Sequence, residues 1–186
     1  MNPSHTNYKR PIDLARRVRT LNGLEKAWIH VQARASTTKD PATQEALTKF
    51  RENQSNELKR IQSDLASGSF RFRAQKGVLK KRSKGKRPRP IVVAPIVNRI
   101  VQRAILDVCQ SPDPKLQRCL GVLPEVVQCV TSVGGLPGRG VPQAMSLITK
   151  AISEGAKWYV RSDLHDFFRH ISKENIRQFL VSNIAD

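Results

Sequence analysis

Hydrophobic positions in the first 68 residues recur every three or four residues, which is the spacing of amphipathic helices. Pro11 suits the first turn of a helix, Asn22-Gly23 interrupts the pattern, and Pro41 opens a longer periodic stretch that stops at Gly68. Three helices are therefore predicted, with apolar faces formed by Leu14, Ala15, Val18 and Leu21, by Leu24, Ala27, Trp28, Val31 and Ala35, and by Leu47, Phe50, Leu58, Ile61 and Leu65.

The period becomes strand-like after Gly68, where aromatic and basic residues alternate. Two short apolar runs follow, separated by a polar turn, and together they predict a β-hairpin whose tip and one face carry cations. The segments concerned are 70–72, 78–79, the turn 83–86, and 91–93. Because proline cannot donate a backbone hydrogen bond, Pro88, Pro90 and Pro95 restrict the second strand to a short or edge position.

Helical spacing returns at Asn98, with Ile100, Val101, Ala104, Ile105 and Val108 on one side, and residues 111–114 end it. Residues 116–130 fit no single pattern. The glycine-rich loop 134–140 leads into a helix that carries Ala144, Met145, Leu147, Ile148 and Ile152. An apolar run at 158–162 predicts a buried strand that ends at Asp163. Ser172 is the expected N-cap of a last helix, whose buried face is expected to hold Ile176, Phe179, Leu180 and Ile184.

The order of elements predicts an α+β fold in which only one strand of a second sheet is present. One strand cannot form a sheet, so we expect the chain to be the beginning of a longer fold or to be completed by a second chain. Lys and Arg number 33 against 15 Asp and Glu, a formal charge of +18. Twelve basic and no acidic residues lie between Asp64 and Asp107, and this uneven distribution favours a polyanionic partner over a surface that is merely solubilising.

No apolar run approaches the length of a membrane span, and the N-terminus lacks an apolar signal region, so we expect a cytoplasmic protein without membrane contact. Cys109, Cys119 and Cys129 match neither a zinc spacing nor an even disulfide set, and we interpret them as free thiols. His165 and His170 are five residues apart and do not share a helical face, which disfavours a histidine metal site.

Three stretches carry candidate chemistry. Arginine and lysine side chains on the hairpin can grip phosphate groups, although a solvated basic loop has the same composition. The glycine-rich loop can bring backbone amides to a phosphate, but it lacks the P-loop pattern and is more typical of a flexible connector. Asp163, at the end of an apolar run, can hold a metal ion, whereas many such aspartates only cap turns.

Taken in order, four segments resemble the bacterial reverse transcriptases of the retron and group II intron type, a group that includes enzymes of anti-phage defence. The segments are RPIVVAP at 89–95, NRIVQRA at 98–104, GGLPGRG at 134–140 and DLHDFF at 163–168, and the resemblance extends over about residues 45–184. It implies a right-hand polymerase with a helical region at 1–68, fingers at 69–155 and the start of the palm at 156–186.

The resemblance also implies roles for individual residues in two-metal nucleotidyl transfer. Asp163 matches the first catalytic carboxylate and would bind Mg²⁺ together with the backbone carbonyl of Leu164, while Phe168 matches the bulky residue that selects deoxynucleotides. Lys86, Arg87 and Arg89 match positions that contact the incoming nucleotide. Contacts to the RNA template and DNA primer are expected from Lys80, Lys81, Arg82, Lys84, Arg99 and Arg139.

The sequence departs from the family pattern in three ways. Asn98 stands where the family commonly has Asp, and Arg169 stands where an acidic residue is frequent. The aromatic-x-Asp-Asp turn that completes the family's active site does not occur, because the chain contains no Asp-Asp pair. We therefore expect the chain to be inactive alone and to need a second chain that supplies the rest of the palm and the thumb. The alternative is a non-catalytic basic module that binds RNA as a scaffold.

Overall fold

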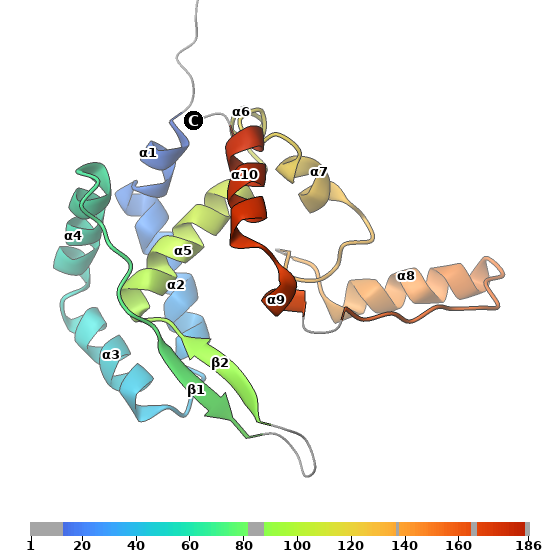
Figure 1. Cartoon of the computed structure of the whole chain (residues 1–186), viewed down its shortest axis with the longest axis horizontal. Coiled ribbons are helices and arrows are strands. Elements are labelled where there is room, and N and C mark those ends of the chain that lie inside the picture. The colour runs from blue at the N-terminus through green and yellow to red at the C-terminus, as the bar shows by residue number, and fades with distance from the viewer. Residues whose placement is uncertain (1–12, 82–87, 137, 165–166, 185–186) are drawn as a thin grey trace, which may run out of the picture. The chain divides into compact units, whose positions relative to one another are not determined.

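The computed structural model describes residues 13–81, 88–136, 138–164 and 167–184, except for the side chains of Phe168 and Arg169. The fold is α+β, as predicted: helices and one two-stranded antiparallel sheet are present in this part of the chain (Figure 1). The chain divides into two compact units, Asp13–Val108 and a unit that contains Cys109–Asp186. No helix in the described ranges is both long enough and apolar enough to cross a membrane.

The described part of the first unit contains five helices, and polar side chains cap the first three of them. The five helices are α1 (Leu14–Val18), α2 (Leu21–Ala35), α3 (Pro41–Glu52), α4 (Gln54–Ala66) and α5 (Ile96–Cys109). Asp13, Thr20 and Asp40 each accept a hydrogen bond from a backbone N–H of the first turn that follows.

Two helix boundaries differ from the prediction. The first break falls at Arg19-Thr20 and not at Asn22-Gly23, because the Thr20 hydroxyl caps α2 by accepting from the Gly23 amide at 3.2 Å. The predicted long third helix is interrupted at Asn53, which ends α3 and precedes α4. Gly68 ends α4 as predicted, with a φ of 71° that a residue with a side chain rarely adopts.

The hydrophobic core of this unit is built from the predicted helical faces. The rings of Trp28 and Phe50 are 4.5 Å apart between centroids, and the Trp28 Nε1–H donates to Gln54 Oε1 at 2.8 Å. Buried side chains in the cluster are Leu24, Ala27, Trp28, Val31, Ala35, Leu47, Phe50, Leu58, Ile61, Ile96, Val97, Ile100, Val101 and Ala104. Ile105, which the helical period places on the same side as Ile100 and Val101, is exposed.

The predicted hairpin is confirmed as β1 (Lys76–Lys80) and β2 (Arg89–Val93), paired antiparallel from Lys76↔Val93 to Lys80↔Arg89. Both strands are short and both are edges of their sheet, as the prolines indicated. Residues 70–72, although their polarity alternates, do not belong to a strand. Phe70 and Phe72 instead contact each other edge to face, with ring centroids 5.2 Å apart.

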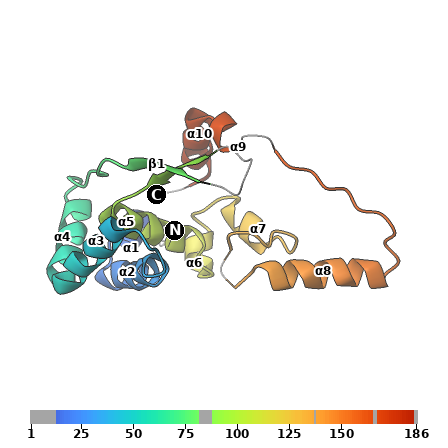
Figure 2. The same ribbon diagram turned by 90° about the horizontal axis from the view of Figure 1, so that it is seen from below.

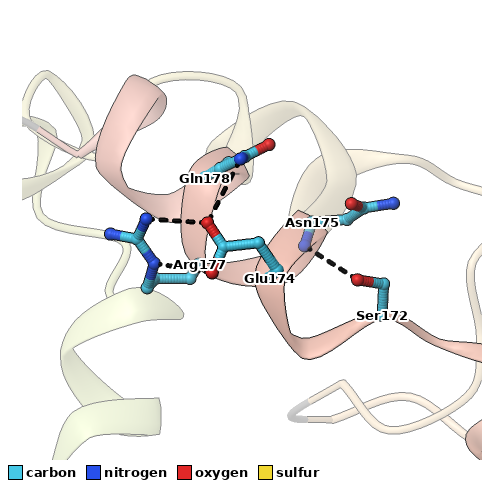
Figure 3. Close-up of polar contacts among 5 residues, drawn as sticks. All are labelled: Ser172, Glu174, Asn175, Arg177 and Gln178. Carbon is cyan, nitrogen blue, oxygen red and sulfur yellow. Dashed lines mark hydrogen bonds and ion pairs between the residues drawn. The ribbon is translucent and has the colours of Figure 1, made fainter.

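The second unit contains α6 (Pro114–Gln117), α7 (Leu123–Gln128), α8 (Val141–Ser153), α9 (Phe167–His170) and α10 (Lys173–Asn183). Ser172 caps α10 as predicted, accepting from the Asn175 amide at 3.2 Å (Figure 3). Glu174 accepts from both Arg177 and Gln178 within the same helix. These contacts stabilise α10 locally, without requiring a core.

The apolar faces expected to be buried in this unit are largely exposed. Leu116 and Leu120 are its only buried hydrophobic residues in the described part of the chain. The apolar residues of α8, among them Met145 and Ile148, are exposed, and so are Ile176, Phe179 and Leu180 of α10. The prediction of helices was right here, whereas the prediction that the face of α10 is buried was wrong, because no described element covers it.

The predicted buried strand at 158–162 is also wrong. These residues follow α8 as an extended trace without strand pairing (Figure 2), and the exposed fractions of Trp158, Tyr159 and Val160 are 93%, 90% and 96%. A β-strand requires a neighbour that accepts and donates its backbone hydrogen bonds. The described chain places no such neighbour beside this segment, so the incomplete second sheet that was expected does not form here.

Candidate nucleic-acid interface

The hairpin is fixed to the helical base by two consecutive side chains of α5. Asn98 is completely buried, and its amide accepts from the Arg73 N–H at 3.0 Å and donates to the Arg73 carbonyl at 2.8 Å. Arg99 Nε–H donates to the carbonyl of Ala94 at 2.7 Å. One side chain thus holds the segment that leads into β1 and the other holds the segment that leaves β2. A two-stranded hairpin alone is only marginally stable, so these anchors position it.

The strand register separates the hairpin residues into two faces. Lys76, Val78 and Lys80 share one face with their partners Val93, Ile91 and Arg89, because alternate residues of a strand point the same way. Leu79 and Val92 lie on the opposite face, with exposed fractions of 71% and 65%. The prediction of a cationic face is confirmed for the described residues, although apolar side chains alternate with the cations on it.

A hollow of about 550 Å³ lies between this hairpin and helices α2, α3 and α5. Arg34, Lys76, Lys80 and Arg99 contribute positive charge to its lining, and Asp40 is the one carboxylate among the lining residues. Apolar side chains such as Ile91 and Ile96 also line it. A concave surface with this excess of cations concentrates anions and suits the sugar-phosphate backbone of a nucleic acid.

Asp40 is not free to pair with the cations of this hollow, because its carboxylate caps α3. Its carboxylate accepts from the Thr43 hydroxyl at 2.6 Å and from the Thr43 amide at 2.9 Å. These hydrogen bonds, with a smaller contribution from the Lys76 and Arg99 charges, lower the pKa of Asp40. The side chain therefore stays ionised and bound to the helix terminus at neutral pH.

The remaining predicted cations have different surroundings. Lys80, Lys81 and Arg89 are exposed at the end of the hairpin, where they can reach a large ligand, while Arg82, Lys84, Lys86 and Arg87 lie outside the described residues. Arg139 belongs to the other unit. Its Nη1 donates to the carbonyls of Cys129 and Ser132, so it ties the glycine-rich loop back to the segment after α7.

Cys129, the residue whose carbonyl Arg139 contacts, has a thiol pKa below its ordinary value. Hydrogen bonds with the Thr131 hydroxyl and amide are the main cause, and the Arg139 charge adds to them. All three cysteines are free, as predicted.

Asp163 and Leu164 lie in the exposed segment that follows α8. Among the described residues, the Asp163 carboxylate has no hydrogen-bond or ion-pair partner, and three His, Cys, Asp or Glu side chains nowhere gather to form a metal site. One carboxylate and one carbonyl are too few ligands to hold Mg²⁺ firmly, so the described residues do not form a complete magnesium site. Phe167 is 45% exposed and not buried, and the side chain of its neighbour Phe168 lies outside the described residues.

The search among protein-family models finds no match to this sequence, and the search among curated proteins finds none either. The sequence pattern did not reveal two lining residues of the hollow, Arg34 and Lys76, or the anchoring role of Asn98. Arg34 and Lys76 were overlooked because they lie outside the dense run of cations, although Arg34 follows His30 by four residues on the exposed side of α2. Asn98 was noted only as a departure from a family pattern, yet a buried amide beside an irregular segment is a known way to satisfy backbone groups.

Proposed function

We propose that this chain forms the fingers and the beginning of the palm of an RNA-directed DNA polymerase of the reverse transcriptase class. The observation that carries the proposal is the ordered series of four motifs, from RPIVVAP at 89–95 to DLHDFF at 163–168. Four short motifs in a fixed order are more specific than any one of them, because chance matches rarely keep the order.

The hairpin and its hollow support a role in holding nucleic acid. Cations line a concave surface whose one carboxylate is bound in a helix cap, and an α5 side chain anchors each end of the hairpin. Anchored cations lose less entropy on binding phosphates than cations on a mobile loop do. In the proposed function, Lys80, Lys81 and Arg89 contact the template strand or the triphosphate of a deoxynucleotide, and Arg99 contacts the strand deeper in the hollow.

The state of Asp163 agrees with a role as a metal ligand that is completed by other residues. Its carboxylate is exposed and is neither buried in a core nor paired with a described arginine. Mg²⁺ held by a complete set of carboxylates would stabilise the negative charge that develops on the transferred phosphate. Asp163 would supply one carboxylate of that set, and the other carboxylates would come from a complete palm.

Primer extension tests the catalytic part of the proposal. The full chain is combined with a polypeptide that carries the rest of a palm, including an aromatic-x-Asp-Asp turn, and is given an RNA template, a DNA primer, deoxynucleotides and Mg²⁺. We expect extension that Asp163→Asn abolishes and that Asp64→Asn, a matched change on α4, leaves intact. Extension that persists in Asp163→Asn would refute the assigned role.

Salt dependence of RNA binding tests the hairpin in the chain alone. Replacing Lys80, Lys81 and Arg89 by Gln removes three phosphate contacts, and on single-stranded RNA this lowers the slope of log K against log salt by about 2. The matched control removes the same charge at Lys49, Arg60 and Arg177, which are exposed and already paired with carboxylates. An equal change in both triple variants would show that only total charge matters.

The second candidate is a non-catalytic module that binds RNA and acts as a scaffold. The net charge of +18 favours it, because a basic surface can bind RNA without a catalytic centre. RNA binding that is unchanged in Asp163→Asn, with no primer extension in any combination of chains, would select this candidate.

A further inference from the structure

A second, smaller hollow of about 320 Å³ lies between α2 and α5. His30 and Arg34 contribute to its lining from α2, four residues apart, and Arg99 and Arg103 contribute from α5 with the same spacing. Residues four apart lie on the same face of a helix, so the two helices present two basic pairs to one space. Arg34 and Arg99 also line the hollow under the hairpin, whereas His30 and Arg103 line only this one.

Arg103 is incompletely satisfied. Its Nη1 is 3.4 Å from His30 Nε2, and its Nη2 forms an ion pair with Asp107 Oδ1 at 2.6 Å. Its Nε is buried and has no hydrogen-bond partner in the part of the chain that the structure describes. A buried donor without an acceptor is unfavourable, so the described residues do not fully satisfy the Arg103 guanidinium.

The charges around the hollow are unbalanced. Arg34, Arg99 and Arg103 contribute three guanidinium groups, and Asp107 is the carboxylate that pairs with one of them. Among the described residues, no carboxylate lies within 4.0 Å of the guanidinium nitrogens of Arg34 or Arg99. Guanidinium groups that approach one another without counter-charges favour an anion between them.

The state of His30 is consistent with this excess of positive charge. Partial burial and then the charges of Arg103 and Arg34 lower the pKa of His30, and the Asp107 carboxylate opposes them. At neutral pH the imidazole is therefore uncharged, and its Nε2 accepts from Arg103. An anion bound here would reverse the balance and raise the pKa of His30, so this ring reports directly on occupancy.

We propose that the hollow between α2 and α5 binds a phosphate group. A phosphate presents several acceptor oxygens in a compact tetrahedron, and guanidinium groups pair with two such oxygens at once. Gln102 adds a polar amide to the lining, and Val31, Ala35 and Leu106 give the hollow an apolar side. Arg99 and Arg103 belong to the motif at 98–104, but the inference uses their charges and positions and not the family resemblance, so it can be tested apart from the polymerase proposal.

NMR of the histidine rings in the full chain tests the site, with two probes of different origin. One probe is inorganic pyrophosphate, and the other is a hexauridylate without terminal phosphates, which offers only phosphodiesters. We expect at least one probe to shift the His30 signals and to raise the pKa of His30. A response to pyrophosphate alone assigns the site to free or terminal phosphates, and a response to hexauridylate assigns it to a nucleic-acid backbone.

Variants distinguish specific binding in this hollow from non-specific attraction of anions to a basic protein. Arg34→Gln, at an exposed position, should weaken the apparent affinity about fivefold, and Arg103→Gln should weaken it at least as much. The matched control, Lys49→Gln, removes one exposed charge that lines neither hollow and should leave the His30 response unchanged. The proposal fails if neither probe shifts His30, or if Lys49→Gln and Arg34→Gln reduce the response equally.

Discussion

The two units of this chain have similar helical patterns but very different interiors. In Asp13–Val108, four helices and the aromatic pair Trp28 and Phe50 enclose a continuous core. In the unit that contains Cys109–Asp186, Leu116 and Leu120 are the buried hydrophobic residues of the described part, while α8 and α10 expose apolar faces. Amphipathic spacing therefore predicts that a helix forms, but it does not predict that the apolar face finds a partner.

The difference teaches where the stability of this chain resides. Hydrophobic burial is the main favourable term in folding, and the first unit contains nearly all of it. The second unit relies on local devices, such as the Ser172 cap and the Glu174–Arg177 ion pair of α10. Local devices of this kind contribute at most about 1 kcal/mol each, so we expect the second unit to unfold first and with little cooperativity.

Replacing the two tryptophans gives the largest expected difference between the two units. Trp28 is 1% exposed and Trp158 is 93% exposed. Trp28→Ala should lower the free energy of unfolding by about 3–5 kcal/mol, because it removes a buried ring and leaves a cavity. Trp158→Ala should change it by less than about 0.5 kcal/mol. Urea denaturation followed by circular dichroism measures both, and equal losses would contradict the comparison.

Asn98 tests whether the hairpin is part of the stable unit. Asn98→Ala removes both hydrogen bonds to the Arg73 backbone and should cost about 2 kcal/mol, because a partly buried N–H and C=O lose their partners. Asn56→Ala is the matched change on α4, where the exposed amide donates only to Asn53 Oδ1. Its effect on the urea midpoint should be small. If both substitutions had a similar effect, the hairpin would not be part of the stable unit.

The smallest effect concerns the caps of the two units at acidic pH. Because hydrogen bonds from Thr43 lower the pKa of Asp40 below 3.8, its contribution to stability is present above that value and is lost as pH falls through the lower folded pKa. In Asp40→Asn, the unfolding midpoint should therefore fall less steeply as the pH is lowered into the acidic range.

Ser172→Ala removes the corresponding cap in the second unit and serves as the comparison. It should reduce helicity slightly at every pH, because a hydroxyl does not titrate, and it should leave the cooperative midpoint of the first unit unchanged. If the unfolding midpoint of Asp40→Asn depended on acidic pH as that of the unchanged chain does, the ionisation of Asp40 would not contribute to stability.

Much of the first unit could be predicted because its local signals agree with its packing. The five apolar positions of α2 are all buried, and the hairpin and the stop at Gly68 are where the pattern places them. The break at Asn53 was not predictable from spacing, because Phe50 and Leu58 are separated by about two helical turns and keep the period across it. The prediction of a strand at 158–162 was wrong for a different reason. A strand needs a second segment to pair with, and the residues of 158–162 do not show whether such a segment is present.

The candidate site was predictable as a charge distribution but not as a geometry. The run of cations from Lys80 to Arg89 pointed to the hairpin, whereas the opposition of Arg34 and Arg99 across α2 and α5 depends on how the helices pack. These two arginines are 65 positions apart in the chain, so no local pattern connects them. The burial of Asn98 likewise follows from packing and not from its immediate neighbours.

Anchoring by adjacent α5 residues also determines where the hairpin can bend. Asn98 fixes the chain at Arg73 and Arg99 fixes it at Ala94, so residues 74–75 alone separate the first anchor from β1, and β2 ends directly before the second anchor. Any rotation of the two strands relative to the helices must occur about these two anchored positions. A ligand that displaces the hairpin therefore also displaces the side chains of α5 that hold it.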